Sequence, residues 1–143
     1  MTTSMSRTER EAFLADLHVG IIAIEDLDGP PVAVPVWYSY TPGGDVEVIT
    51  GHASRKGRLI AAAGRFSLCV QTETPPYRYV SVSGPVVSTE PTDREAQLRP
   101  MARRYLGEVM GDRYVGDGPS IDHASDRILM RPARWYTVDY GKV

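Results

Sequence analysis

The segment TGHASRKGRLIAAAG, residues 50–64, places a hydroxyl group and three cations at the start of a predicted helix. Ser54 is a typical N-cap residue, because its side chain can accept a backbone N–H of the first turn. Arg55, Lys56 and Arg58 have the wrong sign for the positive end of a helix dipole, so we expect a negative group nearby. Helix N–H groups, a hydroxyl and two cations together suit a phosphate. Taken alone, the triplet also fits a solvated basic turn whose side chains lie along the surface.

The preceding segment, VAVPVWYSY at residues 32–40, supplies a wall beside this turn. Pro35 has no N–H for a sheet ladder, so the predicted strand has an edge, a bulge or an opening at that point. The turn signal PGGD at residues 42–45 predicts that the strand folds against residues 46–51. A flat ligand with a phosphate tail fits this arrangement. Three aromatic residues of the segment would line it: Trp37, Tyr38 and Tyr40.

Length and composition bound the class of protein. The 143 residues are expected to form one domain, residues 1–143, with a single core. No apolar run approaches the ~20 residues of a membrane span, and the start MTTSMSRTERE does not resemble a secretory signal, so we expect a cytoplasmic protein without membrane partners. The net charge of -2 gives no overall attraction to nucleic acid. One cysteine, Cys69, and three scattered histidines predict neither a disulfide nor a metal site.

Periodicity and turn signals predict a mainly β fold with short α-helices. Helices are expected at residues 7–16 behind a Ser6–Glu9 capping box, at residues 55–63, and after a Thr92–Glu95 capping box with a kink or restart at Pro100. The β runs are three within residues 19–51, then 66–73, 77–90 and one or two strands in 127–140, with a loop at 111–126. Six runs joined mostly by tight turns favour a small antiparallel barrel over a doubly wound sheet. The chain contains neither a GxGxxG nor a GxxxxGKS sequence, the usual dinucleotide and triphosphate loops.

In this order, the strand, the turn and the basic helix start resemble the pyridoxamine 5'-phosphate oxidase-like split β-barrel superfamily of flavin and deazaflavin proteins. The resemblance is clearest over residues 19–84. Thr50, Arg55 and Lys56 match residues that contact FMN in the oxidase, while Gly51 replaces an asparagine. The resemblance implies a split β-barrel of the FMN-binding type, with the phosphate on Arg55, Lys56 and the Ser54 cap.

Two departures concern the choice of cofactor. Tyr79 stands where the oxidase has a glutamine that reaches the flavin, and Ala33 stands where it has an arginine. These departures are similar to those in the branch that uses the deazaflavin coenzyme F-420, so we favour F-420 over FMN. The resemblance also implies a homodimer with the cofactor in a groove at the interface. Backbone groups of Pro35, Val36 and Trp37 would then flank the ring.

The resemblance implies an oxidoreductase that transfers a hydride between the cofactor and a small-molecule acceptor. The required proton would come from water or from a tyrosine, Tyr38 or Tyr79, and no catalytic residue is assigned. Asp122, His123 and Ser125 have the residue types of a hydrolase triad, but their adjacency in a predicted loop favours solvation.

Several alternatives remain from the sequence. The enzyme could use FMN in the manner of pyridoxamine phosphate oxidase, or the protein could be a carrier of a flavin without turnover. A haem carrier would need an axial histidine, of which the chain offers three: His18, His52 and His123. A purely structural dimer is the last alternative, in which the basic turn binds nothing.

Overall fold

A computed structural model describes residues 2–143 of the chain. Its α-helices are α1 (Arg7–Ala15), α2 (Arg55–Ala63), α3 (Arg99–Leu106) and α4 (Glu108–Val115). Its strands are β1 (Gly20–Ile24), β2 (Val32–Val36), β3 (Val46–Gly51), β4 (Arg65–Gln71), β5 (Arg78–Asp93), β6 (Ile121–Met130) and β7 (Arg134–Asp139). A π-helical turn, Arg94–Leu98, precedes α3, and a short 3-10 helix, Tyr140–Lys142, follows β7. More residues lie in strands than in helices, which confirms the prediction of a mainly β fold.

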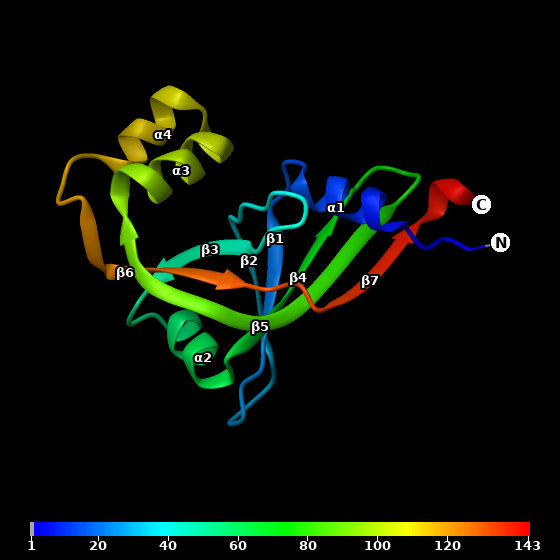
Figure 1. Cartoon of the computed structure of the whole chain (residues 1–143), viewed down its shortest axis with the longest axis horizontal. Coiled ribbons are helices and arrows are strands. Elements are labelled where there is room, and N and C mark those ends of the chain that lie inside the picture. The colour runs from blue at the N-terminus through cyan, green and yellow to red at the C-terminus, as the bar shows by residue number, and fades with distance from the viewer. Residues whose placement is uncertain (1) are drawn as a thin grey trace.

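The strands form one curled antiparallel sheet in the order β2-β1-β4-β5-β6-β3, with β7 also paired to β5. The 16-residue strand β5 curves through the centre of the molecule (Figure 1). Its first half pairs with β4 and β7, and its second half pairs with β6. The register with β6 shifts between Val86 and Ser88 and again between Pro91 and Thr92, as expected where a strand bends. The result is the split β-barrel that the sequence predicts.

The two end strands of the sheet, β2 and β3, are separated by a gap. Among the described residues, their segments share one backbone bridge, between Ser39 and Glu47, with N···O distances of 3.0 and 2.9 Å. Away from this bridge β2 pairs with β1 and β3 pairs with β6. The expected full pairing of residues 32–40 with residues 46–51 is therefore wrong. Pro35 lies exposed on β2, which is an edge strand, so the predicted edge or opening at this residue is confirmed.

The core fills the concave side of the sheet, and α1 covers one end of it. Ser6 and Glu9 form the predicted capping box at the start of α1, which places Phe13 and Leu14 in the core. The Tyr38 hydroxyl is buried there and donates a 2.6 Å hydrogen bond to the Leu14 carbonyl. Strand side chains at most 2% exposed complete this core: Ile22, Ile24, Val46, Val48, Leu68, Val70, Val80, Val82, Ile128 and Met130.

Helices α3 and α4 form a pair beyond the ends of β5 and β6 (Figure 1). The cap before this region is Asp93, whose Oδ1 accepts two backbone N–H groups at 3.0 Å, and not the predicted Thr92. Thr92 is fully buried within β5, so its hydroxyl cannot cap a helix. Pro100 lies in the first turn of α3, after the π-helical turn, so the predicted restart is confirmed. Of residues 111–126, predicted as loop, residues 111–115 belong to α4 and residues 121–126 begin β6.

Candidate functional site

The start of α2 is a tightly packed turn built around Ser54. Its Oγ accepts the Gly57 N–H at 3.0 Å and donates to the Gly51 carbonyl at 2.7 Å. A side chain at Gly57 would place its Cβ 2.4 Å from the Gly51 oxygen, so this position requires glycine. Within residues 2–143, the backbone N–H groups of Arg55 and Lys56 have no hydrogen-bond partner. Two N–H donors and three cationic side chains, those of Arg55, Lys56 and Arg58, are therefore present in the first turn of α2.

The positive charge of this turn is partly balanced by a carboxylate from another loop. Asp26, in the β1–β2 turn, accepts a 2.9 Å hydrogen bond from the Arg55 guanidinium. The pKa of Asp26 is lowered first by the backbone N–H of Asp28 and second by Arg55. Asp26 is therefore the negative group expected near the basic turn. Among the described residues, Lys56 and Arg58 form no ion pair.

A histidine and an aspartate meet beside the same turn. His52 Nδ1 lies 2.8 Å from Asp126 Oδ2, with the imidazole exposed and the carboxylate largely buried. Strand pairing brings them together, because Thr50 on β3 is opposite Asp126 on β6. This pair was not predicted from the sequence, in which 74 positions separate its members. Thr50 itself is buried, with its hydroxyl 3.4 Å from Ser54 Oγ.

The gap between β2 and β3 leads from this turn toward α3. Continuing the antiparallel register of the single bridge places Trp37 level with Ile49 and Pro35 level with Gly51. Pro35 is exposed and Val36 is buried, in keeping with a strand that has one face in the core. Of the predicted site residues, the structure brings Trp37, Thr50 and Gly51 to one cavity. Pro35 lines a separate hollow, with Ile21 and Cys69.

The side chain of Trp37 packs against α3 and α4. Its ring stacks on Tyr105 with 5.2 Å between centroids and planes 5° apart, and Tyr114 lies 5.2 Å away at 54°. The predicted aromatic wall of Trp37, Tyr38 and Tyr40 is therefore wrong in two members, and the aromatic partners of Trp37 come from α3 and α4. Tyr38 and Tyr40, which the sequence analysis placed in the wall, are buried in the core.

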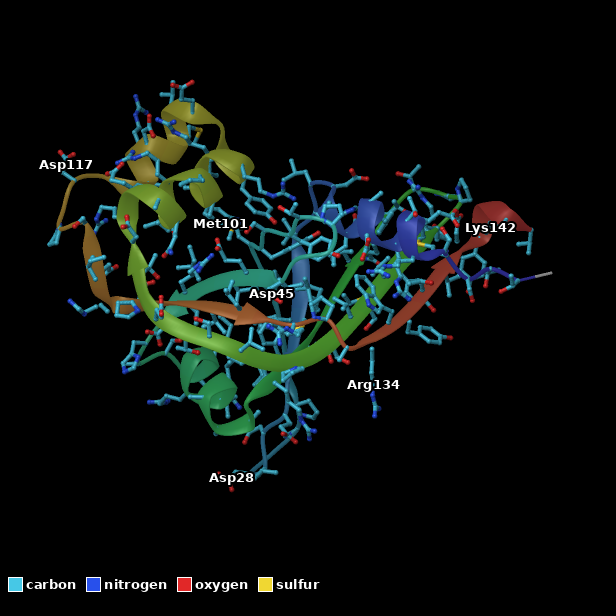
Figure 2. The ribbon with its side chains drawn as sticks, in the orientation of Figure 1. Asp28, Asp45, Met101, Asp117, Arg134 and Lys142 are labelled. Carbon is cyan, nitrogen blue, oxygen red and sulfur yellow. The ribbon has the colours of Figure 1, made fainter. Side chains whose placement is uncertain are left out.

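Helix α3 reaches from one side of the gap to the other. The Tyr105 hydroxyl oxygen accepts the backbone N–H of Tyr38 at 3.1 Å and lies 2.6 Å from the His18 carbonyl, to which it can donate. Met101, 3% exposed, lies on the side of α3 that faces β3 (Figure 2). Tyr105 therefore ties α3 to Tyr38, just beyond β2, while Met101 lies toward β3. No signal in the sequence predicted this placement.

A cavity of about 330 Å³ lies under α3 and α4. Thr50 and Gly51, from the basic-turn motif, form part of its wall. Its other main lining residues come from the β2 end, β3, α3, α4 and β6: Trp37, Ile49, Met101, Tyr114, Val115 and Asp122. The cavity therefore borders the end of β3, from which the loop to α2 begins.

The two tyrosines considered as proton donors lie elsewhere. Tyr38 is fully buried, its hydroxyl donates to the Leu14 carbonyl, and burial raises its pKa far above the usual value. Tyr79 pairs in register with Gln71 near the start of β5. The part of β5 opposite Asp126 lies at Pro91, twelve residues further along. At ~3.3 Å per residue, Tyr79 is remote from the α2 start within one protomer.

The remaining candidates do not form a second centre. His123 is exposed on β6, and the Asp122 carboxylate accepts the Ala124 N–H at 3.0 Å, so the residues considered as a triad are not joined. His18 Nε2 lies 3.0 Å from the Phe13 carbonyl. Residues 2–143 contain no cluster of three or more His, Cys, Asp or Glu side chains placed to hold a metal ion. None of the described helices has the length and apolar character that crossing a membrane requires.

The sequence matches the family described as Pyridoxamine 5'-phosphate oxidase over residues 6–139, which is nearly the whole chain. No curated protein matches the sequence.

Several solved structures share the fold. A protein named F420 Reductase superposes with a TM-score of 0.73 at 24% identity, covering 88% of this chain and 94% of its own. A conserved hypothetical protein from Mycobacterium tuberculosis gives 0.71 at 21% identity, covering 98% of this chain and 88% of its own. An FAD-binding protein from Mesorhizobium loti gives 0.62 at 18% identity, with 93% and 94% covered. At these identities the similarity demonstrates the fold.

Proposed function

Because the chain belongs to the pyridoxamine 5'-phosphate oxidase family, we propose that it is an oxidoreductase that binds the deazaflavin coenzyme F-420 and reduces a small-molecule acceptor. The observation that carries this proposal is the first turn of α2, where two unpartnered N–H groups and the side chains of Arg55 and Lys56 gather beside the gap between β2 and β3. A phosphate is the anion that best uses several N–H donors and cations at one helix start.

The residues of the turn fit the phosphate of such a cofactor. Lys56 has no competing carboxylate among the described residues, so its charge is available. Arg55 is held by Asp26 at an exposed position, where an ion pair contributes little and can be replaced by a stronger anion. Ser54 holds the turn in shape through the Gly57 N–H and the Gly51 carbonyl, so it acts mainly by positioning.

The protein's contribution to the reaction is binding, orientation and exclusion of water. When bound in its reduced form, the deazaflavin supplies a hydride. The backbone at Pro35, Val36 and Trp37 forms one side of the gap and would flank the ring. Helix α3, which Tyr105 joins to Tyr38 just beyond β2, would cover the gap and exclude water. With Tyr38 buried and Tyr79 remote within the protomer, water is the proposed proton source.

The choice of F-420 over FMN rests on two positions at which this chain lacks the residues that contact FMN in the oxidase. Ala33 and Tyr79 cannot supply the arginine and glutamine contacts that FMN receives in the oxidase. The similarity to a solved F420 Reductase supports the same choice. The second candidate is an FMN-dependent enzyme, in which the FMN phosphate would bind at the same first turn of α2.

We also propose that two copies pair through the outer face of β1, β4, β5 and β7. Ile21 is 40% exposed and Tyr136 is 67% exposed on this face, where the Tyr136 ring lies 6.0 Å from that of Tyr79. Pairing would cover these side chains. It would also bring the Tyr79 region of one protomer toward the gap between β2 and β3 of the other. Analytical ultracentrifugation should detect a dimer, and an Ile21→Glu variant should be monomeric. A wild-type monomer would contradict the pairing.

A fluorescence titration of the apoprotein with F-420 and with FMN tests the cofactor. We expect F-420 to bind more tightly than FMN and binding to be lost in the double variant Arg55→Glu/Lys56→Glu. The matched control is Arg7→Glu/Arg131→Glu, which makes the same charge change at exposed side chains away from α2. It should bind as the wild type does.

The outcomes separate the candidates. Preference for FMN, lost in the same double variant, would favour the second candidate. Binding of neither cofactor would contradict both and leave the first turn of α2 as a solvated basic surface.

A further inference from the structure

The cavity under α3 and α4 has no role in holding the phosphate, yet it adjoins the cofactor residues. Trp37 belongs to both: its backbone forms one side of the gap, and its side chain forms a wall of the cavity. Thr50 and Gly51 also line the cavity at the end of β3. A molecule in this cavity would therefore lie next to the ring of a cofactor bound along the gap.

The walls of the cavity combine aromatic and apolar side chains, which can pack on a flat molecule, with polar side chains such as Thr50 and Ser125. The Trp37 ring is held against Tyr105 with nearly parallel planes, so its orientation is fixed. Tyr114 is 61% exposed at the rim and tilted at 54° to Trp37, which leaves its face accessible. Met101 and Val115 are buried and supply apolar surface below. A volume of about 330 Å³ is at the small end for ligand sites, which favours a molecule of one or two rings.

The charges in the cavity are balanced and already hydrogen-bonded. Arg94 donates to the Pro119 carbonyl at 3.1 Å and to the Val115 carbonyl at 2.9 Å. The Asp122 carboxylate accepts the Ala124 N–H at 3.0 Å. One cation and one anion on the wall leave no net charge to attract an ionic ligand. The lining therefore favours a neutral molecule, since an ion would lose its hydration without gaining a partner.

We infer that this cavity is the acceptor site and that it selects small, neutral, planar acceptors by stacking against Trp37 and Tyr114. The acceptor role rests on the proposed function. In that reaction the acceptor gains a hydride from the reduced coenzyme and a proton from water. It is thereby reduced by two electrons as the coenzyme is oxidised by two. The rim residue Tyr114 sets specificity, because it is the exposed aromatic side chain at the entrance.

Calorimetric titration with two probes of the same ring system tests the inference. At neutral pH 2-naphthol is neutral and 2-naphthoate is an anion. We expect one 2-naphthol to bind per chain, at least tenfold more tightly than 2-naphthoate, both in apoprotein and in protein saturated with F-420. Tyr114→Ala should weaken 2-naphthol binding at least fivefold and leave F-420 affinity unchanged. Tyr77→Ala, which removes an exposed tyrosine outside the cavity, is the matched control.

Each other outcome has a distinct meaning. Equal binding of the two probes, or no effect of Tyr114→Ala in a protein with unchanged circular dichroism, would overturn the inference while the cofactor titration still stands. Displacement of 2-naphthol by F-420 would overturn it too, by identifying the cavity as the cofactor's own ring pocket. Binding of 2-naphthol without binding of either cofactor would overturn the acceptor role together with the proposed function.

Discussion

Gly51, in the turn that leads into α2, and the α3–α4 pair border the same cavity, but different kinds of contact hold the two regions in place. The α2 turn is fixed by hydrogen bonds between Gly51, Ser54 and Gly57, which lie within six positions of one another. The α3–α4 pair is placed by contacts such as that between Tyr105 and Tyr38, which are 67 positions apart. The proposed phosphate site is thus built locally, whereas the proposed acceptor site depends on the assembled barrel.

Because of this difference, substitutions in the two regions should impair different binding functions. Changes within the α2 turn should abolish cofactor binding even when α3 and α4 remain in place. Changes within the α3–α4 pair should impair acceptor binding while the α2 turn keeps its shape. The two regions each contain one buried glycine that allows the comparison to be made with the same substitution.

The largest expected effects come from Gly57→Ala and Gly111→Ala. The new Cβ would lie 2.4 Å from the Gly51 carbonyl in the first variant and 2.8 Å from the Arg103 backbone in the second. Overpacking of this kind costs roughly 1–3 kcal/mol of folding free energy. Urea unfolding should show similar losses for both. Cofactor titration should show binding abolished by Gly57→Ala and retained by Gly111→Ala, with 2-naphthol binding lost in the latter.

A control separates loss of geometry from loss of stability. Ala62→Gly, at an exposed position within α2, should cost about 1 kcal/mol without touching the turn. It should keep cofactor binding. If Ala62→Gly or Gly111→Ala abolished cofactor binding as completely as Gly57→Ala, the separation of the two regions would be wrong.

The local character of the α2 turn explains why the sequence predicted it well. Ser54 as N-cap follows from residue chemistry within one helix, and the structure has this cap. The split β-barrel was also predictable, since strand periodicity and the resemblance gave the same fold. Pro35 marked the edge of β2 correctly, because a missing N–H has the same effect in any sheet.

Features that depend on long-range pairing were not predictable in the same way. The His52–Asp126 pair arises from the register of β3 and β6, which no local signal fixes. The partners of Trp37 were assigned to its own strand, whereas α3 and α4 supply them. Thr92 has the sequence of a cap but lies buried in β5. In each case the tertiary structure selected one of several contacts that the sequence allowed.

A smaller effect is expected from Tyr105→Phe. This substitution removes the hydroxyl that joins α3 to Tyr38 and His18, and so tests the contact that places the α3–α4 pair. The backbone N–H of Tyr38 would lose its acceptor, and the His18 carbonyl would lose a 2.6 Å contact. Leaving such groups unpaired costs about 1–2 kcal/mol, while the ring can still stack on Trp37. Urea unfolding should show that loss, and F-420 affinity should stay within twofold of wild type.

The matched control for this prediction is Tyr114→Phe. The Tyr114 hydroxyl forms no hydrogen bond to any described residue, and the side chain is largely exposed. Its removal should leave the unfolding free energy unchanged. Equal destabilisation by both variants would mean that the Tyr105 hydroxyl does not hold α3 over the gap.

The smallest expected effect, from Asp26→Asn, tests the charge balance of the α2 turn. The Asp26 carboxylate competes with a phosphate for Arg55, and its lowered pKa keeps it anionic at neutral pH. Asparagine keeps an oxygen that can accept the Asp28 N–H but removes the charge. Exposed ion pairs of this kind are worth about 0.5–1 kcal/mol, so we expect FMN and F-420 to bind about threefold more tightly. The gain should shrink at high salt.

Riboflavin, which has the ring of FMN without the phosphate, shows whether the gain in affinity depends on the phosphate. Its affinity should be the same in wild type and in Asp26→Asn, since only a phosphate competes with Asp26 for Arg55. Asp28→Asn is the matched control, because it removes a neighbouring carboxylate that forms no ion pair among the described residues. A gain shared by riboflavin, or by Asp28→Asn, would show a general change of surface charge. A gain in affinity that is confined to phosphate-bearing ligands and to Asp26→Asn would instead identify Arg55 as a phosphate ligand for which Asp26 competes.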